Sequence, residues 1–200
     1  VELLVKHGAD VNAVQDSNFN PLMLNINSLF NKGPRIAAFD SEYFDHVKIA
    51  RILIDKKTNL RQAKDGSDQK ALRDAAEVST EITKMIVQDL IWFYDNKQEE
   101  LDHQDSEGFS ALHVAARVGK VDTLKVLVEA GANVNVAEDY GFTPLHEAII
   151  ARKTEAAKYL IKNGADVKHQ ISRGYDSFVS GDAAKEIATK MGNDEIAALC

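Results

Sequence analysis

The sequence predicts an all-α solenoid, a stack of one repeated helical unit that forms a single domain over residues 1–200. Three unlike landmarks recur along the chain, and all three recur at the same spacing. They are two turn glycines, two histidines and two glycines that end apolar segments: Gly108 and Gly141, His113 and His146, and Gly131 and Gly164. A fixed offset shared by unlike residues indicates a structural repeat. Glycine after an apolar segment is typical of a left-handed helix cap, so the repeated unit is predicted to be helical.

Composition limits the classes of partner. With 44% hydrophobic residues and few prolines, the chain can bury a core. A formal charge of −7 disfavours nucleic acids and anionic membranes as partners, because both select clustered Lys and Arg. No apolar run reaches the length of a membrane span, so no membrane insertion is expected. The lone Cys200 fits a reducing compartment, either the cytoplasm or the nucleus.

The first units depart from the regular spacing. Residues 1–13 match the second half of a unit, with Gly8 at the cap, so the sequence is expected to continue a longer protein. Residues 15–62 form the next unit, with an insertion at 30–44. The insertion contains Lys-Gly-Pro at 32–34, which a continuous helix does not accommodate. The helical pattern is expected to resume at Val47.

The later units become regular and then end in a polar unit. Residues 63–104 are divergent, and their apolar pattern predicts a second helix about two turns longer than usual, closing at 98–101. Residues 105–137 and 138–169 are regular copies. Residues 170–200 are more polar, as expected of the terminal cap that keeps a solenoid soluble.

Three segments carry a family resemblance: GFTPLHEAI at 141–149, ARVGKVDTLKVLVEAGANVN at 116–135 and NGADV at 163–167. They resemble the ankyrin repeat. The resemblance implies helix–turn–helix units whose connecting loops project as hairpin fingers, with fingers and first helices forming a concave face. It implies a protein–protein interaction module, which we expect to be monomeric. The formal charge of −7 favours a partner protein of basic or mixed charge. The resemblance also implies that His113 and His146 are structural hydrogen-bonding residues beside Ser110 and Thr143.

The sequence contains no pattern that supports catalysis. It has no glycine-rich phosphate loop, no His-Glu-x-x-His and no serine elbow, and no acidic residue pairs with His or Cys at ligand spacing. We therefore expect no enzyme, no catalytic residue, no cofactor and no metal. Two alternatives stay open: a substrate-docking or regulatory domain of a larger enzyme, or an effector of an intracellular bacterium acting in the host cytosol.

Aromatic residues at one repeat position are the main candidates for partner contact. They follow each turn glycine or its substitute: Phe19, Phe109, Phe142 and Tyr175. Because equivalent positions stack in a solenoid, they are predicted to form a ladder at the finger bases, with Tyr140 beside it. The acidic residues Glu107, Glu138 and Asp139 are predicted to surround the ladder. The rings either pack finger against finger or form a strip of partner contacts. On the second reading, Phe109→Ala with Phe142→Ala abolishes partner capture and leaves the fold intact.

Two further sites follow from the insertion and from the resemblance. Phe39, Tyr43 and Phe44 in or beside the insertion either cover the stack or meet a partner, since exposed aromatic clusters are costly. Asn12 and Asn135 each stand eight residues after a leucine. This pattern is similar to that of ankyrin asparagines modified by the 2-oxoglutarate-dependent asparaginyl hydroxylase. It arises equally where the asparagine ties a loop.

Overall fold

The computed structural model of the protein describes residues 6–7, 9–10, 25, 41–55, 70–93, 97–174 and 178–200. The chain divides into two compact units, Val1–Lys97 and Gln98–Cys200. The two units are described separately below, and the single domain expected over residues 1–200 stays a prediction.

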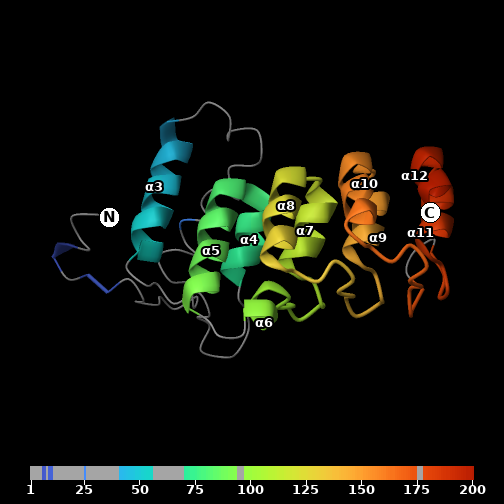
Figure 1. The fold of residues 1–200 in the computed structure, drawn as a ribbon, viewed down its shortest axis with the longest axis horizontal. Coiled ribbons are helices and arrows are strands. Elements are labelled where there is room, and N and C mark those ends of the chain that lie inside the picture. Colours follow the sequence, from blue (N-terminus) through green and yellow to red (C-terminus); the bar gives the residue numbers. More distant parts are fainter. Residues whose placement is uncertain are drawn as a thin grey trace. The chain divides into compact units, whose positions relative to one another are not determined.

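The N-terminal unit contains α3 (Ser41–Asp55), α4 (Lys70–Val78) and α5 (Thr80–Phe93), and α5 packs against both other helices (Figure 1). Its core includes the fully buried side chains of Ile82 and Ile86. Ser79 separates α4 from α5, and its hydroxyl accepts the Ile82 N–H at 3.2 Å. This bond supplies an acceptor for one of the N–H groups that lack a partner at a helix start, so a one-residue connection suffices.

Two helix boundaries differ from the prediction. α3 begins at Ser41, six residues before Val47, because the stretch 41–55 contains neither glycine nor proline and nothing interrupts the helix. α5 has 14 residues where α8 has 10, so as described it is about one turn longer than a regular second helix. The predicted two turns stay a prediction, since residues 94–96 lie outside the described residues. The expected closing stretch is a separate helix, α6 (Lys97–Leu101), with two glutamates in its first turn, where the helix dipole favours negative charge.

The C-terminal unit is a stack of helix pairs. It contains α7 (Ala111–Val118), α8 (Val121–Ala130), α9 (Pro144–Ile150), α10 (Thr154–Lys162), α11 (Ala184–Lys190) and α12 (Asp194–Leu199). In each pair the first helix packs against the second; α9 also contacts both α7 and α11, and α10 contacts α8 and α12 (Figure 1). The first helices therefore form one layer and the second helices another. The all-α solenoid predicted from the sequence is confirmed in this unit.

Side chains of one repeat hold the loop of the next repeat. The Asp102 carboxylate accepts the Asn133 N–H at 2.7 Å. One repeat later, the Asn135 side chain accepts the Asp166 N–H at 2.7 Å and donates to the Gly164 carbonyl at 3.1 Å. Asn135 thus ties two loops together, which accounts for its place in the pattern. Its hydroxylation stays a prediction, and Asn12 lies outside the described residues.

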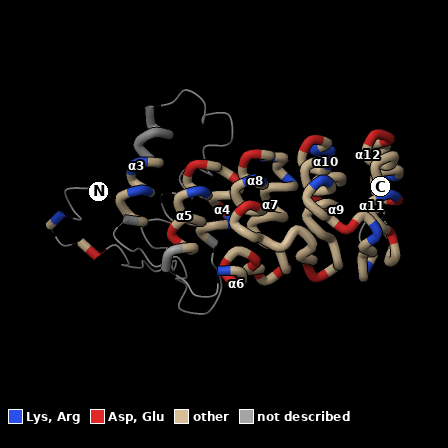
Figure 2. The backbone as a smooth tube through the Cα atoms, viewed as in Figure 1, with Lys and Arg blue, Asp and Glu red and all other residues tan. Residues whose placement is uncertain are grey.

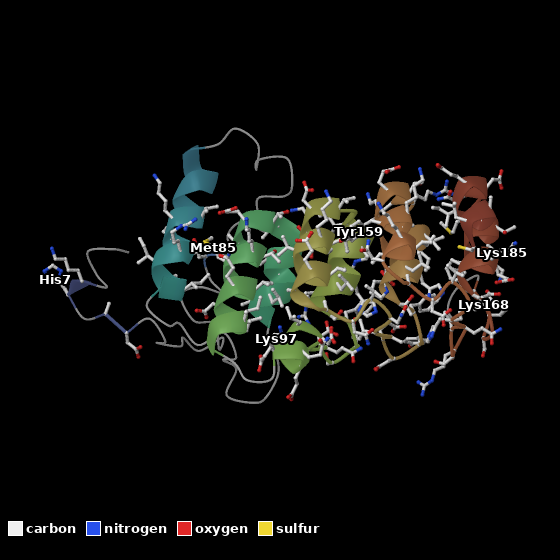
Figure 3. The ribbon with its side chains drawn as sticks, viewed as in Figure 1. His7, Met85, Lys97, Tyr159, Lys168 and Lys185 are labelled. Atoms are coloured by element: carbon white, nitrogen blue, oxygen red, sulfur yellow. The ribbon has the colours of Figure 1, made fainter. Side chains whose placement is uncertain are left out.

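The outer helices of the C-terminal unit carry both signs of charge (Figure 2). Lys158 on α10 pairs with Glu155 at 3.0 Å and with Glu195 on α12 at 2.5 Å. Figure 3 shows Tyr159 on α10 and Lys168 in the loop that follows this helix. Within the part of the chain that the structure describes, no helix is long and apolar enough to cross a membrane.

A candidate binding groove

A groove of about 600 Å³ lies in the C-terminal unit, between the finger bases and the first helices of the two regular repeats. Its walls come from the loops before α7 and α9, from α7 and α9 themselves, and from the segment before α11. The lining residues are Ser106, Glu107, Phe109, Arg117, Glu138, Asp139, Tyr140, Phe142, Glu147, Ile150 and Phe178.

A carboxylate shapes each of the two loops that form the groove. Asp105 Oδ1 accepts the backbone N–H groups of Glu107 and Phe109, both at 2.9 Å. Glu138 stands at the equivalent position of the next repeat. Its Oε1 accepts the backbone N–H groups of Tyr140 at 2.9 Å and of Phe142 at 2.8 Å. Because two N–H groups converge on one oxygen, each loop tip is fixed relative to its own helix. The aromatic and acidic side chains on these loops are therefore held in place before any partner arrives.

The two loops also touch each other through their backbones. Gly108 has a φ of 85°, in the left-handed region that favours glycine. A Cβ atom at this position would lie 2.7 Å from the Asp139 N and 2.8 Å from the Glu138 Cα. A side chain of any size at residue 108 would therefore separate the loops that form the groove wall.

His113 connects the same two repeats through its hydrogen bonds. Its Nδ1 accepts the Ser110 N–H at 3.1 Å, so the ring proton is on Nε2, which donates to the Phe142 carbonyl at 3.0 Å. Burial lowers the pKa of His113 to about 4, and the ring is neutral at physiological pH. Both nitrogens are occupied by structural hydrogen bonds, as the resemblance implies.

His146 repeats the Nδ1 half of this arrangement in the next unit, while no hydrogen bond of its Nε2 matches that of His113. Its Nδ1 accepts the Thr143 N–H at 3.1 Å. Its pKa is lowered to about 4, first by burial and then by His169, whose ring centroid lies 6.0 Å away. His169 in turn donates from Nε2 to the Gly141 carbonyl at 3.2 Å, so these histidines are parts of the scaffold rather than of a reactive site.

The aromatic residues of the groove differ in exposure. Phe142 is 5% exposed and meets Phe178 edge to face, with ring centroids 6.1 Å apart. Phe109 is half-buried, and the Arg117 guanidinium lies 5.4 Å from the centroid of its ring. Tyr140 is 41% exposed. Phe142 therefore packs between repeats, while Phe109 and Tyr140 offer aromatic surface to the groove.

The groove carries an excess of negative charge. Among its described lining residues, four have carboxylates, namely Glu107, Glu138, Asp139 and Glu147, against one guanidinium, that of Arg117. Burial raises the pKa of Glu147, the positive charge of Arg117 opposes this rise, and the charge of Glu138 adds to it. A wall with acidic and aromatic side chains attracts cations, by charge and through the faces of the rings.

A comparison with known protein families agrees with the stack of helix pairs described above. Residues 78–171 match the family described as ankyrin repeats, in three copies. Over these residues the chain belongs to the ankyrin repeat family. A search of curated proteins found no match. Ankyrin repeats are generally protein–protein interaction modules and are typically non-catalytic, so the expected class of function is supported at that level.

The groove brings together six of the residues that the sequence placed in or around the aromatic ladder. These are Glu107, Phe109, Glu138, Asp139, Tyr140 and Phe142. Of the other candidates, Phe19, Phe39 and Tyr175 lie outside the described residues. Tyr43 and Phe44 belong to α3, but their side chains lie outside the description too. That a partner contacts any of these residues stays a prediction.

The ankyrin groove also includes residues that sequence reasoning did not select. They are Ser106, Arg117, Glu147, Ile150 and Phe178. Some of them could have been predicted from their positions within the repeat. Arg117 and Ile150 occupy equivalent positions of consecutive repeats, so the position on the first helix that faces the groove in one repeat faces it in the next. Differences in residue type at such a position indicate a surface that the core does not constrain.

Two observations on the described residues concern metal binding and thiol reactivity. Among the described residues, no group of three or more His, Cys, Asp or Glu side chains could hold a metal ion. Burial raises the pKa of the Cys200 thiol, the opposite of what an activated nucleophile needs. The groove instead offers fixed rings and carboxylates for a non-covalent contact.

Proposed function

We propose that this ankyrin-repeat chain binds a partner protein, without catalysis, through the groove formed mainly by residues in the range 105–150. The observation that carries the proposal is the preformed groove, in which Tyr140 is 41% exposed beside Phe109 on loops fixed by Asp105 and Glu138. Rigid aromatic side chains are favoured anchors at protein interfaces, because they add contact area at little cost in conformational entropy.

The charge of the groove supports a partner with a basic or mixed surface. The chain carries a net charge of −7, and four of its carboxylates line the groove. Such a surface repels nucleic acids and anionic membranes and accelerates encounters with basic proteins. The proposal places the protein, as a monomeric domain, in a reducing compartment of the cell, consistent with its one cysteine.

Site-specific photo-crosslinking tests the proposal. A benzophenone amino acid is placed at Tyr140, on the groove, or at Lys162, an exposed residue of α10 that does not line the groove. After irradiation in an extract of the cells that make the protein, the Tyr140 variant is expected to form discrete protein adducts that the Lys162 variant lacks. Equal adduct patterns from the two positions would count against the groove as the binding surface.

A second arm uses Phe109→Ala in the background that carries the crosslinker at residue 140. Loss of the Phe109 ring removes one wall of the groove but little buried core, since this ring is half-buried. The adducts should weaken while the circular dichroism and the urea midpoint stay close to those of the parent. Undiminished adducts in this folded variant would contradict a role for the aromatic wall.

A further inference from the structure

We propose that the groove receives a basic side chain of the partner protein, lysine or arginine, and that the Glu147 carboxylate is the group that pairs with it. This proposal rests on the proposed function and deepens it, because it names the chemistry of the partner and the residue that selects it. The occupant is a basic segment of a protein chain, lying in the groove of about 600 Å³.

Glu147 departs from the residue type of its repeat position. It follows the N3 residue of α9, and the same position holds Val114 in α7 and Ile187 in α11. Both of these apolar side chains are buried, so in the two neighbouring repeats this position belongs to the core. A carboxylate at such a position opposes the packing of the repeat, and conflicts of this kind are expected at functional sites.

The start of α9 does not explain this acidic residue. The helix dipole favours negative charge in a first turn, but α7 has no acidic residue in its first turn. Both helices begin with the same hydrogen bond, from the Ser110 N–H to His113 Nδ1 in α7 and from the Thr143 N–H to His146 Nδ1 in α9. Formation of the helix therefore does not depend on Glu147.

The Glu147 carboxylate has a groove beside it and no donor from the chain. It is half-buried, and none of the residues that the structure describes donates a hydrogen bond to it or forms an ion pair with it. Burial raises the pKa of Glu147, and the charge of Glu138 adds to this rise. A partly desolvated carboxylate without a donor is unfavourable, and a positively charged donor from a partner would remove this cost.

The cation of the groove is engaged elsewhere. The Arg117 Cζ atom lies 5.4 Å from the centroid of the Phe109 ring, in a cation–π contact, and its guanidinium forms no ion pair with Glu147. Glu107 and Asp139 add two exposed carboxylates to the same groove. The charge of the groove is therefore complementary to that of a basic segment.

The apolar part of the groove favours a basic side chain over a small cation. Phe109 and Ile150 are half-buried and line the groove together with Glu147. Lysine and arginine have long apolar stems that pack along such surfaces while the charged head reaches a carboxylate. Among the described residues, no group of three or more potential ligands could hold a metal ion.

The test is an NMR titration of the complete 200-residue chain, labelled with ¹⁵N. The probes are short glycine–serine peptides that carry two lysines or two arginines. Their matched neutral peptides carry acetyl-lysine or citrulline, which keep the length of the side chain and have no charge. The charged peptides are expected to shift the amides of Phe109, Arg117, Glu147 and Ile150. They should bind about 10-fold more tightly than their neutral counterparts, the gain typical of a hydrogen bond to a charged group.

Variants separate Glu147 from the net charge of the protein. Glu147→Gln keeps the shape of the side chain and should weaken binding of the charged peptides about 10-fold without lowering the urea midpoint. Glu129→Gln removes the same charge from an exposed position of α8, outside the groove, and should change binding less than 2-fold. Arg117→Gln removes the competing cation and should strengthen binding about 2-fold.

Four results would overturn the proposal: equal binding of charged and neutral peptides, equal effects of Glu147→Gln and Glu129→Gln, amide shifts confined to other surfaces, or no binding up to millimolar peptide. The comparison of peptides uses the unaltered chain, so it does not depend on the stability of a variant. If the crosslinks at residue 140 persist in those cases, the groove binds a protein by other chemistry and the proposed function stands. If the crosslinks are absent as well, both proposals fail.

Discussion

Alanine at Gly108 should destabilise the protein far more than alanine at Gly164, although both glycines have left-handed backbones with φ of 85° and 91°. A left-handed conformation costs an ordinary residue about 1 kcal/mol or slightly more. At Gly164 a Cβ meets nothing within 4 Å, so this cost is the whole effect. At Gly108 it would also lie 2.7 Å from a backbone atom of Asp139, which must move. Such overpacking adds about 2 kcal/mol.

The expected losses are therefore about 3 kcal/mol for Gly108→Ala and about 1 kcal/mol for Gly164→Ala. Both substitutions restrict the unfolded chain equally, so that contribution cancels in the comparison. Urea unfolding followed by circular dichroism measures the two free energies of unfolding, with the slope checked for a common mechanism. Equal losses at the two sites would refute the close backbone contact between the loops that form the groove.

Three other predictions concern acid stability, the loop ties and the aromatic residues. The pKa values of His113 and His146 fall from 6.5 to about 4 on folding, so the unfolded state binds more protons between these pH values. The free energy of unfolding should therefore drop as pH falls from 6.5 to 4, by up to about 3 kcal/mol per histidine. His113→Gln should make the urea midpoint depend less steeply on pH, and an unchanged slope would exclude His113 as a cause of the pH dependence. Asn135→Ala removes both hydrogen bonds to the next loop and should lower the free energy of unfolding by about 1–2 kcal/mol, measured with urea. Asn163→Ala should cost less, because the Asn163 side chain forms its hydrogen bond within its own helix turn. Equal losses would contradict the role of Asn135 in joining the loops. Phe142→Ala should cost about 3 kcal/mol or more because the ring is buried, whereas Tyr140→Ala should cost less than about 1 kcal/mol, and thermal melts that coincide would show that Phe142 is not packed.

The burial of Phe142 also changes how the groove is best tested. The sequence places Phe109 and Phe142 at equivalent repeat positions, so replacing both was expected to leave the fold intact. The structure buries Phe142 against Phe178 and leaves Phe109 half-buried. Tyr140 is therefore the better partner for Phe109 in a double substitution.

The repeat spacing was enough to predict the helix pairs of the C-terminal unit. The constant offset between copies sets the register, and the caps and apolar positions then follow in each copy. It also selected Glu107, Phe109, Asp139 and Tyr140, because equivalent positions in a solenoid stack in space. What the sequence could not supply is the side-chain detail that differs between copies.

Helix ends and exposure are where the pattern gave too little information. The repeat does not determine whether a given ring in the ladder is covered, since that depends on the neighbour, and Phe178 covers Phe142. Arg117 and Glu147 occupy first-helix positions at which the adjacent repeats have Ile150 and Val114. From hydrophobic periodicity alone, such positions are predicted to be ordinary solvent-facing helix surface. The length of α5 depends on where the next helix starts, and the apolar pattern alone does not show that start.

Among the described residues, the hydrogen bonds that join a side chain of one repeat to the backbone of another run in one direction along the chain. Side chains of the earlier repeat hold backbone groups of the later one: Asp102 holds Asn133, Asn135 holds Asp166, and His113 holds the Phe142 carbonyl. The two ends of the stack in the C-terminal unit are therefore not equivalent. As far as these bonds are concerned, removing a repeat from the N-terminal side leaves backbone groups without acceptors or donors, whereas removing one from the C-terminal side leaves side chains that turn to water. Shortening from the C-terminus should accordingly be the better tolerated of the two.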